Sequence, residues 1–409
     1  MQDRELYQQI LGLKSPWSVS EVSLDLKLQQ VDVFVEHPSG TSFCCPECSQ
    51  SLACYDHTPA RQWRHLDSCQ FRTILHASIP RVDCPEHGVK QVRVPWAEKG
   101  SRLTILFERF AVQVLLATQT VKGAMSILGT KWDQTWSIIE RAVARGQARK
   151  RQQQIPRLGI DEKAFLKGQN YLTLLYDLDR STVEAISDGN DTNAGIACLS
   201  QLSDEQIRSV EAIAMDMSAA YVNAAKQMVP FAETKIVHDR FHIMQMATKA
   251  VDKVRRGEHR ALMKDGDDRL SRTKYVWLTS HEHLSEKQQQ VFDATYDQQL
   301  QTGKAWAYKE MLRDLWSQSS AASATMYFTD WYKRVIHTRL GPLKTVARSI
   351  KERLQNVVNY CTHRVTNAVA EGMNSKIMSI KRRVGGFRNR QNFKTAIFFH
   401  CGGLDLYPQ

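Results

Sequence analysis

Long apolar runs, internal repeats and low-complexity tracts are absent from this sequence of 409 residues. A helix that spans a membrane needs about 20 consecutive apolar residues. The first residues, MQDRELYQQILGLKSPW, contain acids and lack the apolar core of a secretory signal. With 42% hydrophobic and 24% charged residues, the composition is that of a globular protein with two or three domains. We therefore expect a cytoplasmic protein with no membrane partner.

Acidic residues are scarce in two parts of the chain. The net charge of +12 by itself favours a nucleic-acid partner only weakly. Residues 141–157 hold six basic residues and no acid, and from Glu371 to Lys394 seven basic residues accompany one acid, Glu371. A solvated surface charge is the ordinary explanation for a single glutamate, but the clustering points to a polyanion and makes Glu371 a residue to explain.

The nine cysteines are not expected to form a disulfide framework, because the cytoplasm keeps thiols reduced. Five of them fall within 26 residues, and a sixth follows in a second short motif. The motifs CPEC and CPEH each place two ligands three positions apart, the spacing at which a tight turn directs both at one ion. The predicted zinc ligands are Cys45, Cys48, Cys84 and His87.

Two features leave this zinc assignment open. The 35-residue gap between the motifs exceeds the usual value of about 15 to 20, and incidental buried thiols are the alternative. No carboxylate that would activate water lies nearby, so the predicted role of zinc is structural. Substitute ligands would be Cys44, Cys54 or Cys69, and weaker candidates are His57, His65 and His76.

Apolar patterning divides the rest of the chain. Residues 18–36 alternate as in a hairpin, and residues 158–165, 171–179 and 182–189 read as three successive strands before helices and strands alternate. This order predicts a mixed sheet with helices on its faces. Residues 257–345 lose the strand signal, and their four tryptophans recur at helical spacing, which favours a helical core over a stacking surface. The expected domains are 1–97, 98–155, 156–256, 257–345 and 346–409.

Three helices are expected between the cysteine motifs and the first of these strands. The predicted ranges are 103–118, 121–129 and a third helix after Thr130, whose capping signature is completed by Asp133. This pattern suits a helix-turn-helix, although generic three-helix packing explains it equally well. The start of its last helix would contact bases through Lys131, Trp132, Gln134 and Thr135.

Two aspartates fall in or at the ends of predicted strands. Asp161 ends or interrupts the first strand and Asp216 ends the fourth. Singly, each reads as a turn or a helix cap. Together they resemble the paired acids of a ribonuclease H-like sheet, in which a later helix supplies the third acid, here Glu371. Three carboxylates suit two Mg²⁺ or Mn²⁺ ions, which activate a water or a 3′-hydroxyl for attack on a phosphodiester. The same helix face carries Asn367, Asn374 and Met378.

At this point the sequence resembles the DDE transposases of bacterial insertion sequences, specifically the ISL-three family. The resemblance covers nearly the whole chain. It rests on CPEC and CPEH with RQWRHLD and PRVDC, then VPWAEKGSRLT, GIDE, AMDMSAAY, VHDRFHI, TNAVAEGMNSKI and RRVGGFRN, in that order.

The resemblance implies a catalytic triad of Asp161, Asp216 and Glu371 with the helical segment inserted before Glu371. It also implies that Asp239 and His242 form an Asp-x-x-His motif near the site. Asp161 fits the pattern better than the adjacent Glu162, since neighbouring strand residues point to opposite faces.

The function that follows is transposition. The zinc module and the helix-turn-helix would bind terminal inverted repeats as a dimer or larger oligomer, and the triad would free 3′ ends and join them to target DNA, in a bacterial cytoplasm and on the nucleoid when bound. A stand-alone nuclease and a catalytically inactive DNA-binding regulator are the alternatives. Further DNA contacts are expected from Lys376, Lys381, Arg382, Arg383 and Arg388.

Overall fold

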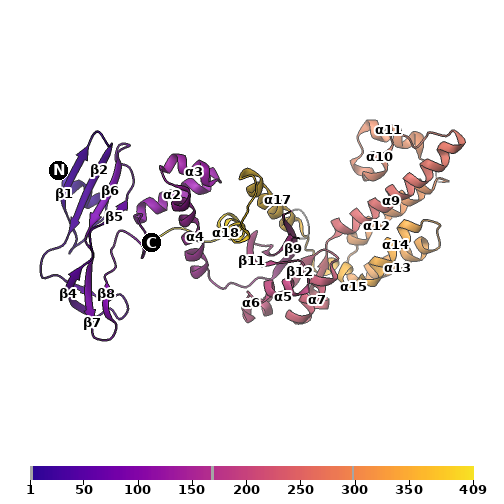
Figure 1. Cartoon of the computed structure of the whole chain (residues 1–409). Helices are drawn as coiled ribbons and strands as arrows, with labels where there is room; N and C mark the ends of the chain where they lie inside the picture. Colours follow the sequence, from indigo (N-terminus) through magenta and orange to yellow (C-terminus); the bar gives the residue numbers. More distant parts are fainter. Residues whose placement is uncertain (1–2, 167–169, 297–298) are drawn as a thin grey trace. The chain divides into compact units, whose positions relative to one another are not determined.

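The computed structural model describes residues 3–166, 170–296 and 299–409, which divide into two compact units (Figure 1). The first unit comprises Met1–Lys150 together with Phe398–His400 and Leu404–Gln409. The second comprises Arg151–Ile397 and Cys401–Gly403. The C-terminal tail therefore belongs to the N-terminal unit.

The first unit begins with a short helix, α1 (Asp3–Ile10), and a four-stranded sheet in the order β1-β2-β6-β5. The expected hairpin is present, since β1 and β2 are antiparallel. Alternate residues Val31, Val33 and Val35 of β2 are buried in the core of the unit, which is why the period of two in the sequence is so regular. The strands are β1 (Ser18–Asp25), β2 (Gln30–Glu36), β5 (Arg61–Arg64) and β6 (Arg72–Ala77).

A second small sheet, in the order β3-β4-β7-β8, carries the two cysteine motifs. Each motif occupies the turn of a hairpin, the first between β3 and β4 and the second between β7 and β8. Because β4 and β7 are antiparallel, both turns lie at the same end of the sheet. The strands are β3 (Ser42–Cys44), β4 (Ser51–His57), β7 (Pro80–Cys84) and β8 (Gly88–Gln91).

Three helices complete the first unit, as the sequence predicted: α2 (Ile105–Thr118), α3 (Val121–Leu128) and α4 (Trp132–Arg149). The expected cap of α4 at Thr130 is wrong. The cap is Lys131, whose backbone N–H donates to the side chain of Gln134, while the Thr130 hydroxyl bonds to that of Thr135. The side chain at the third helical position satisfies the free N–H at this terminus.

The second unit is built on a five-stranded mixed sheet in the order β11-β10-β9-β12-β13. The first three strands form an antiparallel meander, and β12 is parallel to both β9 and β13. The predicted mixed sheet is therefore confirmed. The strands are β9 (Arg157–Leu166), β10 (Asn170–Asp177), β11 (Thr182–Asp188), β12 (Ala212–Met215) and β13 (Ile236–His238).

Helices cover both faces of this sheet. Leu158 and Ile160 of β9 face a core that includes residues of α5 and α7, whereas Gly159 between them faces Asn367 at the start of α17. Adjacent residues of a strand point to opposite faces, so α17 packs on the face away from α5 and α7. The helices are α5 (Thr192–Leu199), α6 (Asp204–Ser209), α7 (Ala219–Met228), α8 (Ala232–Lys235), α17 (Ala368–Arg383) and α18 (Arg390–Cys401).

Between β13 and α17 the chain is helical. α9 (Arg240–Leu262) starts directly after β13, so the boundary expected at residue 257 falls inside a helix. Trp277, Trp306, Trp316 and Trp331 are all buried in one core, as their spacing predicted. The remaining elements are η1 (Met263–Asp265), α10 (Lys274–Leu278), η2 (His281–His283), α11 (Glu286–Thr295), α12 (Gln301–Arg313), η3 (Asp314–Ser317), α13 (Ala321–Ile336), α14 (Gly341–Glu352), α15 (Leu354–Val358) and α16 (Tyr360–His363). Within residues 3–166, 170–296 and 299–409, no helix has the length and apolarity to cross a bilayer.

Candidate active site and nucleic-acid interface

Three aspartates fall at neighbouring positions of β9, β12 and β13, at the carboxyl ends of the last two strands. Ala214 of β12 pairs with Gly159 of β9, and Met215 pairs with His238 of β13. Extending these registers along the strands places Asp216 beside Asp161 on one side and beside Asp239 on the other. Neighbouring strands are separated by about 4.8 Å, so these positions bring three carboxylates together. Asp161 interrupts no strand, because β9 continues to Leu166.

Asp161, and not its neighbour Glu162, faces helix α17. The Nδ2 of Asn374 donates to Oδ2 of Asp161 at 2.6 Å. Glu162 points to the other face, where its carboxylate accepts from Nδ2 of Asn190 at 2.8 Å. Close packing of α17 at this point requires Gly159, since a Cβ there would lie 3.3 Å from Oδ1 of Asn367 and 2.7 Å from a methyl group of Leu178.

Glu371 of α17 lies beside one of these aspartates. Its carboxylate, that of Asp239 and the imidazole of His242 each contribute a ligand atom, and these atoms lie within 4.8 Å of one another. Nδ1 of His242 is 3.3 Å from Oδ2 of Asp239, which is 4% exposed. Asp161 and Asp216 interact electrostatically with the same imidazole. Among the described residues this group of three includes neither Asp161 nor Asp216, so the immediate neighbours of Glu371 are Asp239 and His242.

Burial and neighbouring carboxylates raise the pKa values of two acids in this site, Asp161 and Glu371. Burial, reinforced by the charge of Asp216, raises the pKa of Asp161 to about 6, against the opposing hydrogen bond from the N–H of Glu162. Burial and the charge of Asp239 raise the pKa of Glu371. The hydrogen bond to Asp239 raises the pKa of His242. Carboxylates that ionise reluctantly for these reasons are stabilised by a bound cation.

Asp161→Asn is therefore expected to raise the melting temperature of the metal-free protein at pH 8. Asp161 is ionised there at a cost to the folded state, whereas asparagine still accepts the bond from Asn374. The gain in melting temperature is largest above pH 6. It shrinks as the pH falls from about 6 toward the ordinary carboxyl pKa, and it vanishes below that pKa, where Asp161 is protonated in both the folded and the unfolded protein. Thermal melts in EDTA between pH 4 and 8 measure this difference. A lower melting temperature for the variant at pH 8 would contradict it.

A tyrosine that the sequence analysis missed completes the surroundings of Asp161. The hydroxyl of Tyr176 on β10 donates to Oδ1 of Asn374 at 2.9 Å, and this tyrosine is fully buried. A carboxylate accepts only, so Asn374 must turn its NH₂ group toward Asp161 and its oxygen toward Tyr176. Asn367 is also fully buried, and its amide atoms have no hydrogen-bond partner among the described residues.

The predicted zinc ligands meet in the first unit. Ligand atoms of Cys45, Cys48, Cys84 and His87 lie within 4.8 Å of one another. The sulfurs of Cys48 and Cys84 are 3.7 Å apart, and Sγ of Cys84 is 3.5 Å from Nδ1 of His87. A tetrahedral zinc with bonds of about 2.3 Å to sulfur and about 2.1 Å to nitrogen separates such pairs by about 3.8 and 3.6 Å. The spacing therefore fits zinc.

The substitute ligands considered from the sequence lie outside this cluster of four. Cys54 approaches His57 instead, with Sγ 3.8 Å from Nε2. His65 is bonded to the hydroxyl of Thr104, and the imidazole of His76 pairs with a carboxylate of β2. At the first motif, backbone N–H groups of Cys48 and Glu47 lower the pKa of the Cys45 thiol.

Three of the four side chains predicted to contact bases are exposed at the start of α4. Lys131, Trp132 and Gln134 are exposed, and Trp132 stacks on Trp136 with a ring separation of 5.5 Å. The prediction is wrong for Thr135, which is fully buried and bonded to the carbonyl of Lys131. Helical periodicity explains this, because the threonine lies on the inward face of α4.

The basic residues of the closing segment have different surroundings. Lys376, Arg382, Arg383 and Arg388 are exposed. Lys381 is half-buried, and its ammonium donates to the carbonyls of Ala164 and Phe165 at 3.1 and 2.5 Å. It fixes the end of β9 to α17.

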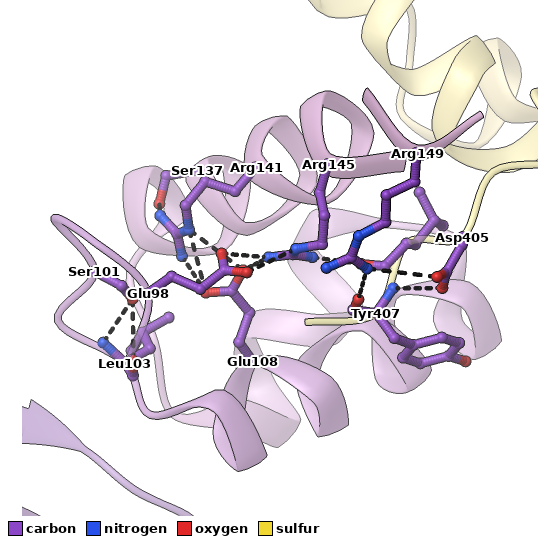
Figure 2. A network of polar contacts seen from close by, with 11 residues as sticks. Glu98, Ser101, Leu103, Glu108, Ser137, Arg141, Arg145, Arg149, Asp405 and Tyr407 are labelled. Carbon is purple, nitrogen blue, oxygen red and sulfur yellow. Dashed lines mark hydrogen bonds and ion pairs between the residues drawn. The ribbon is translucent and has the colours of Figure 1, made fainter. Parts of the chain in front are cut away.

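The three arginines of α4 form ion pairs inside the first unit. For these three residues, the inference that the basic cluster at 141–157 binds a polyanion is therefore wrong. Figure 2 shows Arg141 and Arg145 on the carboxylate of Glu108, which is 2% exposed. Arg145 also binds Glu98 and the carbonyl of Leu406. Arg149 donates to the carbonyl of Tyr407 and pairs with Asp405. These three charges stabilise the fold and hold the C-terminal tail.

Comparison with known protein families gives three matches in chain order. Residues 41–87 match the zinc finger of the transposases of IS204, IS1001, IS1096 and IS1165. Residues 92–143 match the helix-turn-helix domain of transposase family ISL3. Residues 158–397 match the DDE transposase domain of the same family.

Curated proteins of similar sequence carry consistent names. The chain is 25% identical over 361 residues to the transposase for insertion sequence element IS1001 of Bordetella parapertussis, a match that covers 87% of this chain and 88% of the relative. It is 26% identical over 376 residues to the transposase for IS1557 of Mycobacterium tuberculosis, covering 85% and 83% of the two chains.

Proposed function

This chain belongs to the ISL3 (ISL-three) family of transposases, and from that premise we propose that it binds the terminal inverted repeats of its insertion sequence, cleaves phosphodiester bonds there and joins the freed 3′ ends to target DNA. We base the chemical part on Asp161 and Asp216, at neighbouring positions of adjacent strands, and on Glu371 of α17. The carboxylate of Glu371 lies within 4.8 Å of Asp239 and His242, beside that pair. The zinc ribbon and the helix-turn-helix domain supply the binding of DNA.

The second unit has the arrangement of a ribonuclease H-like domain in this proposal. Three antiparallel strands are followed by two strands parallel to the first, and the two aspartates lie on neighbouring central strands. The helical segment from α9 to α16 is then an insertion between the second and third acids. The edge of the sheet at the carboxyl ends of parallel strands is where open sheets place chemistry.

Asp161, Asp216 and Glu371 would hold two Mg²⁺ or Mn²⁺ ions. Carboxylate oxygens are the donors these ions prefer, and the mutual repulsion of the acids is what a cation relieves. When bound, the ions would activate water or a 3′-hydroxyl and stabilise the leaving oxygen. A structural zinc would be held by Cys45, Cys48, Cys84 and His87, which fit it in donor type and spacing.

Residues of the chain prepare this site before any ion arrives. Asn374 and the N–H of Glu162 each donate to one oxygen of Asp161, which fixes the plane of its carboxylate. The N–H of Ser218 donates to Oδ1 of Asp216. The hydrogen bond to Asp239 raises the pKa of His242, which favours the protonated imidazole beside the acids. Fixed orientation avoids reorganisation during the reaction.

The test uses purified full-length protein, a labelled duplex that carries the end of its element, and a target plasmid, with Mg²⁺ or EDTA. We expect Mg²⁺-dependent nicking at the element end and covalently joined products. Cutting without joining under all conditions would indicate a nuclease. Binding with no cutting would indicate a DNA-binding regulator, and would contradict the proposal.

Tyr176→Phe is expected to slow cleavage roughly tenfold and to raise the Mg²⁺ concentration needed for half-maximal rate. Without the hydroxyl, the amide of Asn374 loses the bond that fixes its orientation toward Asp161. DNA binding should be unchanged. The matched control is Tyr221→Phe, another buried tyrosine, whose hydroxyl bonds to Thr173. Identical Mg²⁺ dependence of Tyr176→Phe and the wild type would show that Tyr176 has no positioning role.

A further inference from the structure

A cavity of about 880 Å³ opens on the first unit between the zinc ribbon and the segment that leads into α2. Trp63 and Val92, both buried, form part of its floor. Residues from the first zinc knuckle, from β5 and from β8 contribute to its walls. None of the residues proposed for cleavage of DNA lines this cavity.

The walls of this cavity are basic. Its lining includes five cationic side chains and two acids, Glu47 and Glu98. Among the described residues the five cations form no ion pair, and Arg93 donates to the carbonyl of Pro46 at 2.9 Å. The five are Arg61, Lys90, Arg93, Lys99 and Arg102.

The network of Figure 2 neutralises one of the two acids in the lining, Glu98. Both oxygens of Glu98 accept from Arg145 of α4, at 2.9 and 2.7 Å. The guanidinium thus cancels the charge of Glu98 and leaves Glu47 against five cations. Such an excess of like charge, without an ion-pair partner in the described part of the chain, is a footprint for a polyanion.

The same contact fixes where this cavity lies relative to the exposed start of α4. Arg145 is 13 residues from Trp132, and a helix rises 1.5 Å per residue, so the two are separated by about 20 Å along α4. In duplex DNA this distance is about six base pairs. A single duplex is therefore long enough to contact both the start of α4 and the basic walls, and the excess of positive charge there favours DNA as the occupant.

We propose that this basic cavity is a second DNA contact of the first unit, which receives the phosphodiester backbone beside the sequence read by α4. The inference rests on the proposed function, because it takes DNA ends as the ligand. The contact supplies affinity without sequence choice, since phosphates are the same at every base pair. The ion pair of Arg145 with Glu98 and its hydrogen bond to the carbonyl of Leu406 in the tail keep the wall in place.

The test is a salt titration of DNA binding by full-length Lys90→Gln/Lys99→Gln/Arg102→Gln. Each lost phosphate contact reduces the slope of log affinity against log salt by about one. We expect a reduction of about three, with affinity lowered equally for the element end and for unrelated duplex. The matched control, Arg4→Gln/Lys14→Gln/Lys27→Gln, removes the same charge from exposed positions outside the cavity and should keep the wild-type slope.

Zinc content and melting temperature establish that both variants are folded, and Arg102→Gln alone, at an exposed position, should change the slope by about one. A cavity variant with the wild-type slope, or an equal loss in the control, would overturn the inference while leaving the proposed function intact. Failure of the wild type to bind the element end would instead refute the proposed function.

Discussion

Glu371→Gln is expected to abolish cleavage and joining of DNA, with a loss of at least about a thousandfold, while affinity for the element end stays within about twofold. Removing this carboxylate would remove a proposed metal ligand and one negative charge from the site. Metal ions supply several kcal/mol of transition-state stabilisation, and each 1.4 kcal/mol is about tenfold in rate. Asp161→Asn and Asp216→Asn should behave alike. Cleavage rates and binding isotherms on the same labelled duplex measure both quantities.

The structure provides a matched control for this prediction. Glu162 is adjacent to Asp161 in sequence, but it points to the opposite face of the sheet and binds Asn190. Glu162→Gln removes the same charge and should keep most of the wild-type rate. Near-full activity of Glu371→Gln, Asp161→Asn or Asp216→Asn would remove that residue from the proposed triad.

Cys45→Ser is expected to lose bound zinc and to unfold the small sheet of the first unit. Structural zinc sites contribute on the order of 10 kcal/mol or more to the folding of small domains, and the two knuckles lie on hairpins that are joined by the pairing of β4 with β7. DNA binding should fall with the loss of the fold. Zinc per chain, measured by atomic emission, should drop from one to near zero.

The adjacent Cys44 provides the control that shows whether loss of zinc is specific to the four predicted ligands. Cys44 is exposed and outside the group of four ligands. Cys44→Ser should retain one zinc per chain and normal DNA binding. Unchanged zinc content in Cys45→Ser would refute the ligand assignment.

Features that depend on local spacing could be predicted from the sequence. Both cysteine knuckles lie in hairpin turns, where ligands three residues apart converge without help from the rest of the fold. The succession of strands and helices around Asp161 and Asp216 follows from apolar patterning, whereas the pairing of the first strand with the fourth was expected only from the resemblance to a ribonuclease H-like sheet. Tryptophans at helical spacing in residues 257–345 were correctly assigned to a core.

Features that depend on distant partners could not be predicted. Arg145 binds Glu98, 47 residues away, and Leu406, 261 residues away, so an arginine from a run that looked like a DNA contact stabilises the first unit. Tyr176 acts on a residue 198 positions later. Thr135 is polar, yet its place on the inward face of α4 is decided by packing. Sequence shows charge and periodicity but not which partner neutralises a charge.

The most direct test of the central claim, that Asp161, Asp216 and Glu371 hold the catalytic metal ions, is a change of metal preference. Each residue is replaced in turn by cysteine, and cleavage of the element end is measured in Mg²⁺ and in Mn²⁺. Thiolate is a poor ligand for Mg²⁺. In contrast, Mn²⁺ is a first-row transition metal that binds N, O and S donors, although more weakly than the later metals of the series. The account predicts no activity in Mg²⁺ and recovery in Mn²⁺ for at least one position. Wild-type activity in Mg²⁺, or no recovery in Mn²⁺ at all three positions, would contradict it.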